Sequence, residues 1–298
     1  VIAGDSGGSL KEYGIAFAKT TMLEPDGTYN EANHLARLER DLQQYRPKVV
    51  HIQRSRGYAL RPSLTVAQIG NMAALVKRLL PEAIVFVDNC YGEFVEEKEP
   101  LEVGADILCG SLIKNPGGGL APTGGYIAGK AELVELAACR LAVPGLGREA
   151  GSYAYGYRLF YQGFFMAPHV VAQALKTAVF AAALLQNAGF SVNPGPFDFR
   201  TDIIQAVSLG SREKLLAFLK GIQAGAPVDS FVTPTPTAMP GYDDEVAMAA
   251  GAFVQGASIE LSADGPMRPP FTAFLQGGLT YESGRLGILR AVSEMGVL

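Results

Sequence analysis

The alternation of strand-like and helix-like patterns is the feature that most constrains the fold. Short runs rich in β-branched residues alternate with amphipathic segments whose apolar residues recur at helical spacing. This order predicts an α/β fold class, with a mostly parallel sheet that carries helices on both faces. The predicted strands are 13–22, 48–53, 83–89, 106–111 and 123–129, and the predicted helices are 30–46, 65–80 and 131–141.

The pattern changes near residue 165. One long apolar helix is predicted over 167–189, and shorter units follow it, with strands at 190–194, 202–209 and 258–263 and helices at 211–223 and 283–296. Shorter, mixed units are typical of an α+β arrangement. We therefore predict a large domain over residues 1–165, and a second part over 166–298 that consists of the long linking helix and a smaller C-terminal domain.

Composition and charge exclude several classes of protein. The net charge is −4 and there is no basic run, which argues against a nucleic-acid partner. The three cysteines and three histidines are scattered, which suits a reduced, cytoplasmic protein and argues against a metal site. The longest apolar stretch, residues 170–185, contains Gln173 and Lys176 and is short for a membrane span. The first residues lack a signal-peptide pattern.

Polar side chains follow two neighbouring strands at the points where the strands end. Asp88 closes the stretch IVFVD, Ser111 closes ILCGS, and Lys114 comes three residues later, before three glycines. In open parallel sheets, ligands bind beyond the carboxyl ends of the strands, so these side chains should converge on one crevice. Taken alone, each would more often be an ordinary surface or loop residue.

An amine and a carboxylate in such a crevice suit pyridoxal phosphate. Lys114 can form a Schiff base with the cofactor's aldehyde and can carry protons once a substrate replaces it. Asp88 can hold a proton on the pyridine nitrogen, which keeps the ring an electron sink. Ser111 can donate to the phosphate, and the glycines at 117–119 let the backbone approach the cofactor closely.

Arginines stand at two further places where an anion could bind. Arg54 and Arg56 follow the predicted strand 48–53, and Arg268 lies among prolines and a glycine. A guanidinium group suits a carboxylate or a phosphate. Ion pairs within loops are an equally good interpretation of the first two, and a structural role in a rigid turn is the alternative for the third.

The stretch from Asp88 to Lys130 resembles the cysteine and methionine branch of pyridoxal-phosphate enzymes, which share the type I aminotransferase-like fold. Within that branch, the chain is similar to the methionine gamma-lyase-related family, whose members are often labelled aluminium resistance proteins. The similarity covers essentially the whole chain. It is carried by VDNCYGEF, GSLIKNPGGG, TGGYIAG, QGFFMAPHVV, SIELSADGPMRPPF and LQGGLTYESG.

The resemblance implies a role for individual residues. Lys114 would be the aldimine lysine, Asp88 the partner of the pyridine nitrogen and Ser111 a phosphate contact. Asn89 and Tyr91 would approach the ring hydroxyl of the cofactor. The implied substrate-binding residues are Arg268, which matches the neighbourhood of the carboxylate-binding arginine, and more weakly Arg54, Arg56 and Tyr58.

The resemblance also implies a function, namely a pyridoxal-phosphate-dependent carbon–sulfur lyase acting on a sulfur-containing amino acid, assembled as a homodimer or homotetramer. Other chemistry on the same cofactor, such as transamination or desulfuration, is an alternative. Family members also have an N-terminal portion, absent here, that carries a phosphate cup, a ring-stacking aromatic residue and a subunit arm. An inactive, truncated remnant is therefore a further alternative.

Overall fold

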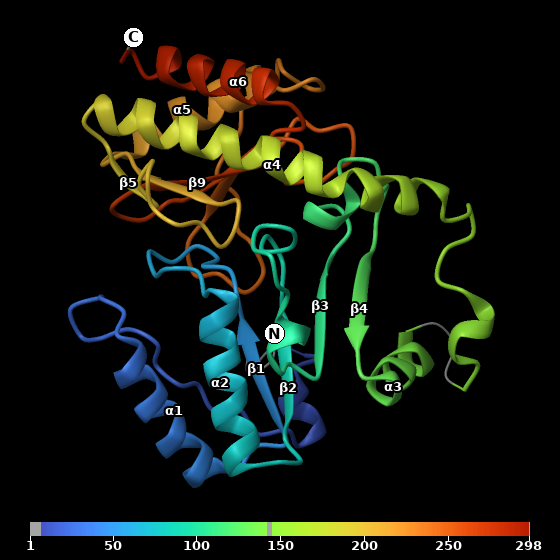
Figure 1. Cartoon of the computed structure of the whole chain (residues 1–298). Helices are drawn as coiled ribbons and strands as arrows, with labels where there is room; N and C mark the ends of the chain where they lie inside the picture. The colour runs from blue at the N-terminus through green and yellow to red at the C-terminus, as the bar shows by residue number, and fades with distance from the viewer. Residues whose placement is uncertain (1–6, 142–144, 298) are drawn as a thin grey trace.

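The computed structural model describes residues 7–141 and 145–297, and these form two β-sheets connected through one long helix (Figure 1). The first sheet has the order β1-β2-β3-β4, with β1 at Val49–Gln53, β2 at Ile84–Asp88, β3 at Ile107–Ser111 and β4 at Gly125–Gly129. The first three strands are parallel, as predicted, but β4 is antiparallel to β3. The chain between β3 and β4 holds no crossover helix, so it returns directly and reverses the strand direction.

Helices α1 (Glu31–Tyr45) and α2 (Val66–Leu79) pack beside this sheet (Figure 1). Ile69 and Val76 of α2 are fully buried in one cluster with Val85 and Val87 of β2. Helices on both faces were predicted, but less exposed and more exposed residues alternate along the described β1, β2 and β4, a pattern typical of a sheet covered on one face. Helix α3 (Ala131–Leu141) follows β4.

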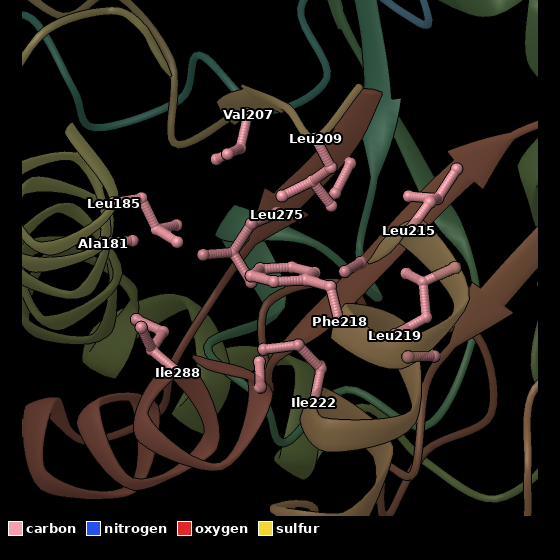
Figure 2. Close-up of a cluster of buried hydrophobic side chains, with 14 of the residues drawn as sticks. Ala181, Leu185, Val207, Leu209, Leu215, Phe218, Leu219, Ile222, Leu275 and Ile288 are labelled. Carbon is pink, nitrogen blue, oxygen red and sulfur yellow. The ribbon is translucent and has the colours of Figure 1, made fainter. Parts of the chain in front are cut away.

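The second sheet is antiparallel throughout, with the order β5-β6-β9-β8-β7. Helices α5 (Arg212–Ala224) and α6 (Tyr281–Glu294) pack against each other and close a core in which Phe218, Leu275 and Ile288 are buried (Figure 2). A strand was predicted at 258–263, yet β8 lies a few residues later. The strands are β5 Ser191–Asn193, β6 Gln205–Ser208, β7 Val246–Ala249, β8 Ser262–Pro266 and β9 Thr272–Gln276.

The segment 13–22 was predicted as a strand and is not one. It follows a 3-10 turn at Leu10–Tyr13, and the described part of this region forms a single isolated bridge, between Leu23 and Tyr29. Its apolar residues alternate as in a strand, but tertiary pairing decides whether such a run joins a sheet.

The long helix α4 spans Arg158–Asn187 and so begins earlier than the predicted residue 167. Pro168 is typical of a first helical turn, but here it lies inside the helix. By length and composition alone, this is the one helix among the described residues that could cross a membrane. Of an apolar stretch of 18 residues within this helix, 44% is buried inside the protein.

The first turns of α4 pack on the chain around Lys114. Gly163 of α4 lies directly against Gly117, and a side chain at either position would overlap the backbone of the other segment or of its own loop. Gly118 has a φ of 54° and is just as close to the carbonyl of Gly163. The glycines after Lys114 therefore allow close backbone contact with α4.

Asn115 ties the Lys114 segment to the chain after β2. Its side chain is fully buried, and its amide donates hydrogen bonds to the carbonyl oxygens of Tyr91 and Glu93, each at 3.0 Å. Both hydrogens of the amide are used, so the two loops are held in one relative position. This contact fixes where Lys114 stands relative to Asp88.

We expect Gly163→Ala to destabilise the protein, although alanine ordinarily favours a helix by about 1 kcal/mol. The added methyl overlaps the Gly117 carbonyl, and forced overpacking of this kind costs about 1–3 kcal/mol. Chemical denaturation would measure the change in the free energy of unfolding. Gln162→Ala, at the exposed neighbouring position, is the control and should leave stability almost unchanged. A stabilised Gly163→Ala variant would contradict the packing described.

We expect Asn115→Ala to lower the free energy of unfolding by about 1–3 kcal/mol, because the buried carbonyl of Glu93 loses its donor, whereas the carbonyl of Tyr91 keeps the N–H of Ile203. Thermal and urea unfolding would measure it. Asn71→Ala, which removes one exposed hydrogen bond to Glu31, is the matched control and should cost far less. Equal losses in the two variants would show that Asn115 does not hold the loops together.

Candidate active site

A cavity of about 260 Å³ lies at the carboxyl ends of β1 and β2, and residues of the C-terminal sheet also line it. Of the residues predicted for the site, Asp88, Lys114, Tyr91 and Tyr58 line it. The structure therefore brings the acid and the amine to one cavity, as the strand-end argument predicts. Their roles in a reaction stay predictions.

Lys114 follows β3 and extends its amine over the ring of Tyr91, with Nζ 4.3 Å from the ring centroid. Burial acts to lower the pKa of this amine, but Tyr91, Cys90 and Asp88 together outweigh burial and raise its pKa above the usual lysine value. The free amine is therefore a cation at neutral pH. A cation over an aromatic face beside a carboxylate is a stable arrangement.

Asp88 is the last residue of β2, and Tyr91 belongs to the turn that follows. One carboxylate oxygen of Asp88 accepts the backbone N–H of Cys90 at 3.1 Å, which fixes the side chain beside the cavity. Tyr91 has a φ of 73°, a strained value for a residue with a side chain, and such strain is concentrated at functional sites. Its hydroxyl lies 3.3 Å from that of Ser258.

Two predicted cofactor contacts stand away from the cavity surface. Ser111 ends β3, and its carbonyl accepts the backbone N–H of Lys114 at 3.4 Å, but its side chain is not among those that line the cavity. Asn89 is buried and uses its side chain to bind Arg54 and Glu99. Asn89 thus supports the loop after β2 from behind and does not face the space beside Lys114.

Arg54 does not reach the cavity. Its side chain is 0% exposed, and its guanidinium binds Asn89, Glu96 and Glu99 at 2.8–3.3 Å. Gly92 lies so close that a side chain there would overlap the guanidinium. The proposed substrate role of Arg54 is therefore not supported by its position. The sequence places Arg54 after a strand but cannot say whether the side chain turns toward the crevice or beneath the loop.

Arg56 and Arg268 also have protein partners. Nη1 of Arg56 donates to the backbone and side-chain oxygens of Asn193, at 3.1 and 2.7 Å, and so connects β5 to the loop after β1. Arg268 pairs with Asp244 at 2.7 Å and donates to the carbonyl of Tyr58. It lines a second cavity, of about 220 Å³, which shares Tyr58 and Phe274 with the first. Of the two, Arg268 is therefore the better placed to meet a ligand.

A buried acid lies behind the site. Burial raises the pKa of Glu93 to about 8, and the hydroxyl of Tyr126 donates to Glu93 Oε1 at 2.9 Å. Glu93 therefore carries a proton over much of the neutral range. The backbone carbonyl of Glu93 is one of the two that accept hydrogen bonds from the side chain of Asn115.

The structure adds cavity residues that the sequence argument did not select. Cys90 lines the cavity, where burial raises the pKa of its thiol to about 12. Asp264 of β8 and Gln276 of β9 form part of the opposite wall. The only sequence signal for Asp264 was its place four residues before Arg268. Within the described ranges, no three His, Cys, Asp or Glu side chains gather as metal ligands would.

The model of the family described as methionine gamma-lyase matches residues 1–296. The uncharacterised protein YnbB of Bacillus subtilis is 52% identical over 295 residues, which is 99% of this chain and 69% of that protein. A solved structure from Listeria monocytogenes, of a suggested cystathionine beta-lyase involved in aluminium resistance, is 52% identical with a TM-score of 0.91 and covers 99% of this chain and 71% of its own. The chain thus spans about seven-tenths of these relatives.

A carbon–sulfur lyase involved in aluminium resistance from Clostridium novyi is 48% identical, with a TM-score of 0.88 and coverage of 98% of this chain and 67% of its own. The pyridoxal-5′-phosphate-dependent protein YhfS of Escherichia coli and the cystathionine gamma-lyase of yeast are only 15% and 16% identical, with TM-scores of 0.59 and 0.53, and so show the fold alone. The predicted resemblance is confirmed: this chain belongs to the methionine gamma-lyase family, a family of carbon–sulfur lyases.

Proposed function

We propose that this protein is a pyridoxal-phosphate-dependent carbon–sulfur lyase that acts on a sulfur-containing amino acid. The observation that carries the proposal is that the amine of Lys114 and the carboxylate of Asp88 line one cavity of about 260 Å³. The relatives named as lyases support the reaction class, and the distant pyridoxal-phosphate-dependent neighbour supports a fold that accepts this cofactor.

The residues present fit the cofactor. Lys114 supplies an amine for its aldehyde, and Asp88 supplies a carboxylate for its ring nitrogen. Tyr91 adds an aromatic face beside the amine. Ser111 is a proposed phosphate contact at the end of the neighbouring strand. When bound, pyridoxal phosphate serves as an electron sink that makes the Cα proton of an amino acid acidic.

The chain's own groups then have distinct tasks. The free Lys114 amine is held as a cation by Tyr91, Cys90 and Asp88, so it would have to give up one proton before it could act as a base in the cavity. The N–H of Cys90 fixes the carboxylate of Asp88, which would face the cofactor's ring nitrogen. Arg268 is the proposed partner of the substrate carboxylate, which would replace Asp244 at the guanidinium.

The proposed assembly is a homodimer or homotetramer, and the exposed rings near the start of α4, such as Phe165 at 83% exposure, are its proposed contact patch.

We expect Lys114→Ala to abolish covalent attachment of pyridoxal phosphate. Borohydride treatment of the wild-type protein incubated with the cofactor, followed by peptide mass mapping, should find the added mass on the peptide that contains Lys114. Lys98→Ala, which removes an exposed lysine from a nearby loop, should leave the labelling unchanged. Persistence of the cofactor's visible absorbance in Lys114→Ala, with labelling at another lysine, would overturn the assignment.

We expect Asp88→Asn to weaken cofactor binding by roughly tenfold to a hundredfold, the effect of losing a hydrogen bond to a charged group. Asparagine can still accept the N–H of Cys90, so the loop should stay in place. Titration of cofactor fluorescence would give the dissociation constant, and assays for thiol, ammonia and keto acid would give the rate. An unchanged affinity would remove Asp88 from the site. An amino-group acceptor in place of released ammonia would indicate transamination.

A further inference from the structure

Glu93 is a buried acid behind the site, and the proposed reaction does not use it. The residue is 4% exposed. Its Oε1 accepts the hydroxyl of Tyr126 on β4 at 2.9 Å, whereas its Oε2 has no hydrogen-bond partner among the described residues. A side chain at Gly110 of β3 would overlap Glu93 Oε1 and the ring of Tyr126. The carboxyl therefore lies across β3 and connects the turn after β2 to β4.

The charges beside this carboxyl are balanced without it. Arg54 supplies a positive charge there, and its guanidinium pairs with the carboxylates of Glu96 and Glu99 at 3.0 and 3.3 Å. An ionised Glu93 would be a third carboxylate beside one guanidinium, buried and with one oxygen unpartnered, which is a costly arrangement. The packing therefore favours the neutral acid.

The neighbouring groups agree with a neutral Glu93. Burial is the main cause that raises the pKa of Glu93 to about 8, and the charge of Glu99 acts in the same direction. The hydroxyl of Tyr126, the backbone N–H of Glu93 itself and the charge of Arg54 act in the opposite direction. The titratable and charged groups around Glu93 are Arg54 after β1, Cys90, Glu96 and Glu99 after β2, Cys109 in β3 and Tyr126 in β4.

The turn that contains Glu93 carries two parts of the candidate site. The backbone N–H of Cys90 fixes the carboxylate of Asp88, and the ring of Tyr91 lies beside the amine of Lys114. The backbone carbonyl of Glu93 accepts a hydrogen bond from the segment that carries Lys114. A displaced Glu93 would therefore change the surroundings of both the acid and the amine.

We propose that Glu93 is a positioning residue whose protonated carboxyl holds the turn after β2 against β3 and β4, and that loss of this proton weakens the binding of the cofactor by Asp88 and Lys114. The cofactor part of this inference rests on the proposed function. An ionised carboxylate has to be hydrated, and hydration of Glu93 requires the turn to open.

Glu93→Gln tests the proposal, because glutamine has the shape of the neutral acid and cannot ionise. Fluorescence titration would give the dissociation constant of pyridoxal phosphate for both proteins over a range of pH, and Lys114 and the cofactor titrate alike in the two. We expect the ratio of the wild-type to the variant constant to rise about tenfold between about pH 7 and about pH 9, because only the protonated fraction of the wild-type protein binds well.

Glu97→Gln is the matched control. It removes an exposed carboxylate from the same loop and should keep the wild-type dependence of cofactor binding on pH.

A second measurement needs no cofactor. Hydrogen exchange of the peptide 88–95, followed by mass spectrometry, reports how often the turn opens, since its N–H groups are hydrogen-bonded, as is that of Gly92 to the carbonyl of Asn89. We expect this peptide in the wild-type protein to lose protection relative to Glu93→Gln as the pH rises through about 8. A comparison at equal pH cancels the intrinsic dependence of exchange on pH.

The free energy of unfolding should follow the same proton. The folded pKa of Glu93, about 8, lies above its ordinary value of 4.5, so the stability that the protonated side chain provides is complete below the lower value. That stability is lost as the pH rises toward the higher value. Urea unfolding should therefore show the wild-type protein becoming less stable relative to Glu93→Gln over this interval.

Tyr126→Phe keeps the proposal testable should Glu93→Gln fold poorly. It removes the hydroxyl that favours the ionised carboxylate and so raises the pKa of Glu93 further. We expect the alkaline loss of cofactor affinity to move to higher pH in this variant. A purely structural role of the contact would instead weaken binding equally at every pH.

The outcomes separate this inference from the proposed function. A ratio of dissociation constants that stays constant with pH, or equal protection of the turn in wild-type protein and Glu93→Gln at every pH, overturns the role of Glu93. When the cofactor is still bound, that result leaves the lyase proposal intact. An alkaline loss of protection in the wild-type protein alone, without uptake of pyridoxal phosphate at any pH, supports the hold of Glu93 on the turn and overturns the lyase proposal.

Discussion

The two hydrogen bonds from the buried amide of Asn115 are the contact on which the rest of the site depends. They join the segment after β3 to the turn after β2, and each of these segments carries one half of the amine–acid pair. Strand pairing alone sets the spacing of β2 and β3, but it ends where the strands end. Beyond that point, the Asn115 amide keeps Lys114 and Asp88 facing one cavity.

Three glycines near this contact allow the Lys114 segment to pack closely against helix α4. Gly117 and Gly118 bring the segment against the first turns of α4, and Gly163 removes the side chain that would keep the two backbones apart. A lysine just before three glycines therefore sits on a short, well-packed turn and not on a mobile loop. The rigidity comes from the close packing of the backbones.

The sequence was sufficient for the features that depend on local pattern. The strands that end at Asp88 and Ser111 were predicted almost to the residue, and their shared edge followed from parallel pairing. The direction of a side chain was not predictable in the same way: Arg54 and Tyr58 lie in the same loop, yet one is closed off by Gly92 and the other lines the cavity. Asp264 was missed because it reaches the cavity through the antiparallel pairing of β8 with β9. The local sequence pattern did not define where these two strands begin and end, so it could not place Asp264 opposite Phe274.

The two walls of the cavity come from separate sheets, and this division has a consequence for how the protein could adapt. The amine–acid pair is built entirely on β2, β3 and the turns that follow them, whereas Asp264, Phe274 and Gln276 belong to the C-terminal sheet. A small rigid rotation of one sheet against the other would change the room left for a ligand without altering the chemistry-bearing pair. Relatives that share this fold could thus diverge in what they accept while the geometry around the lysine stays the same.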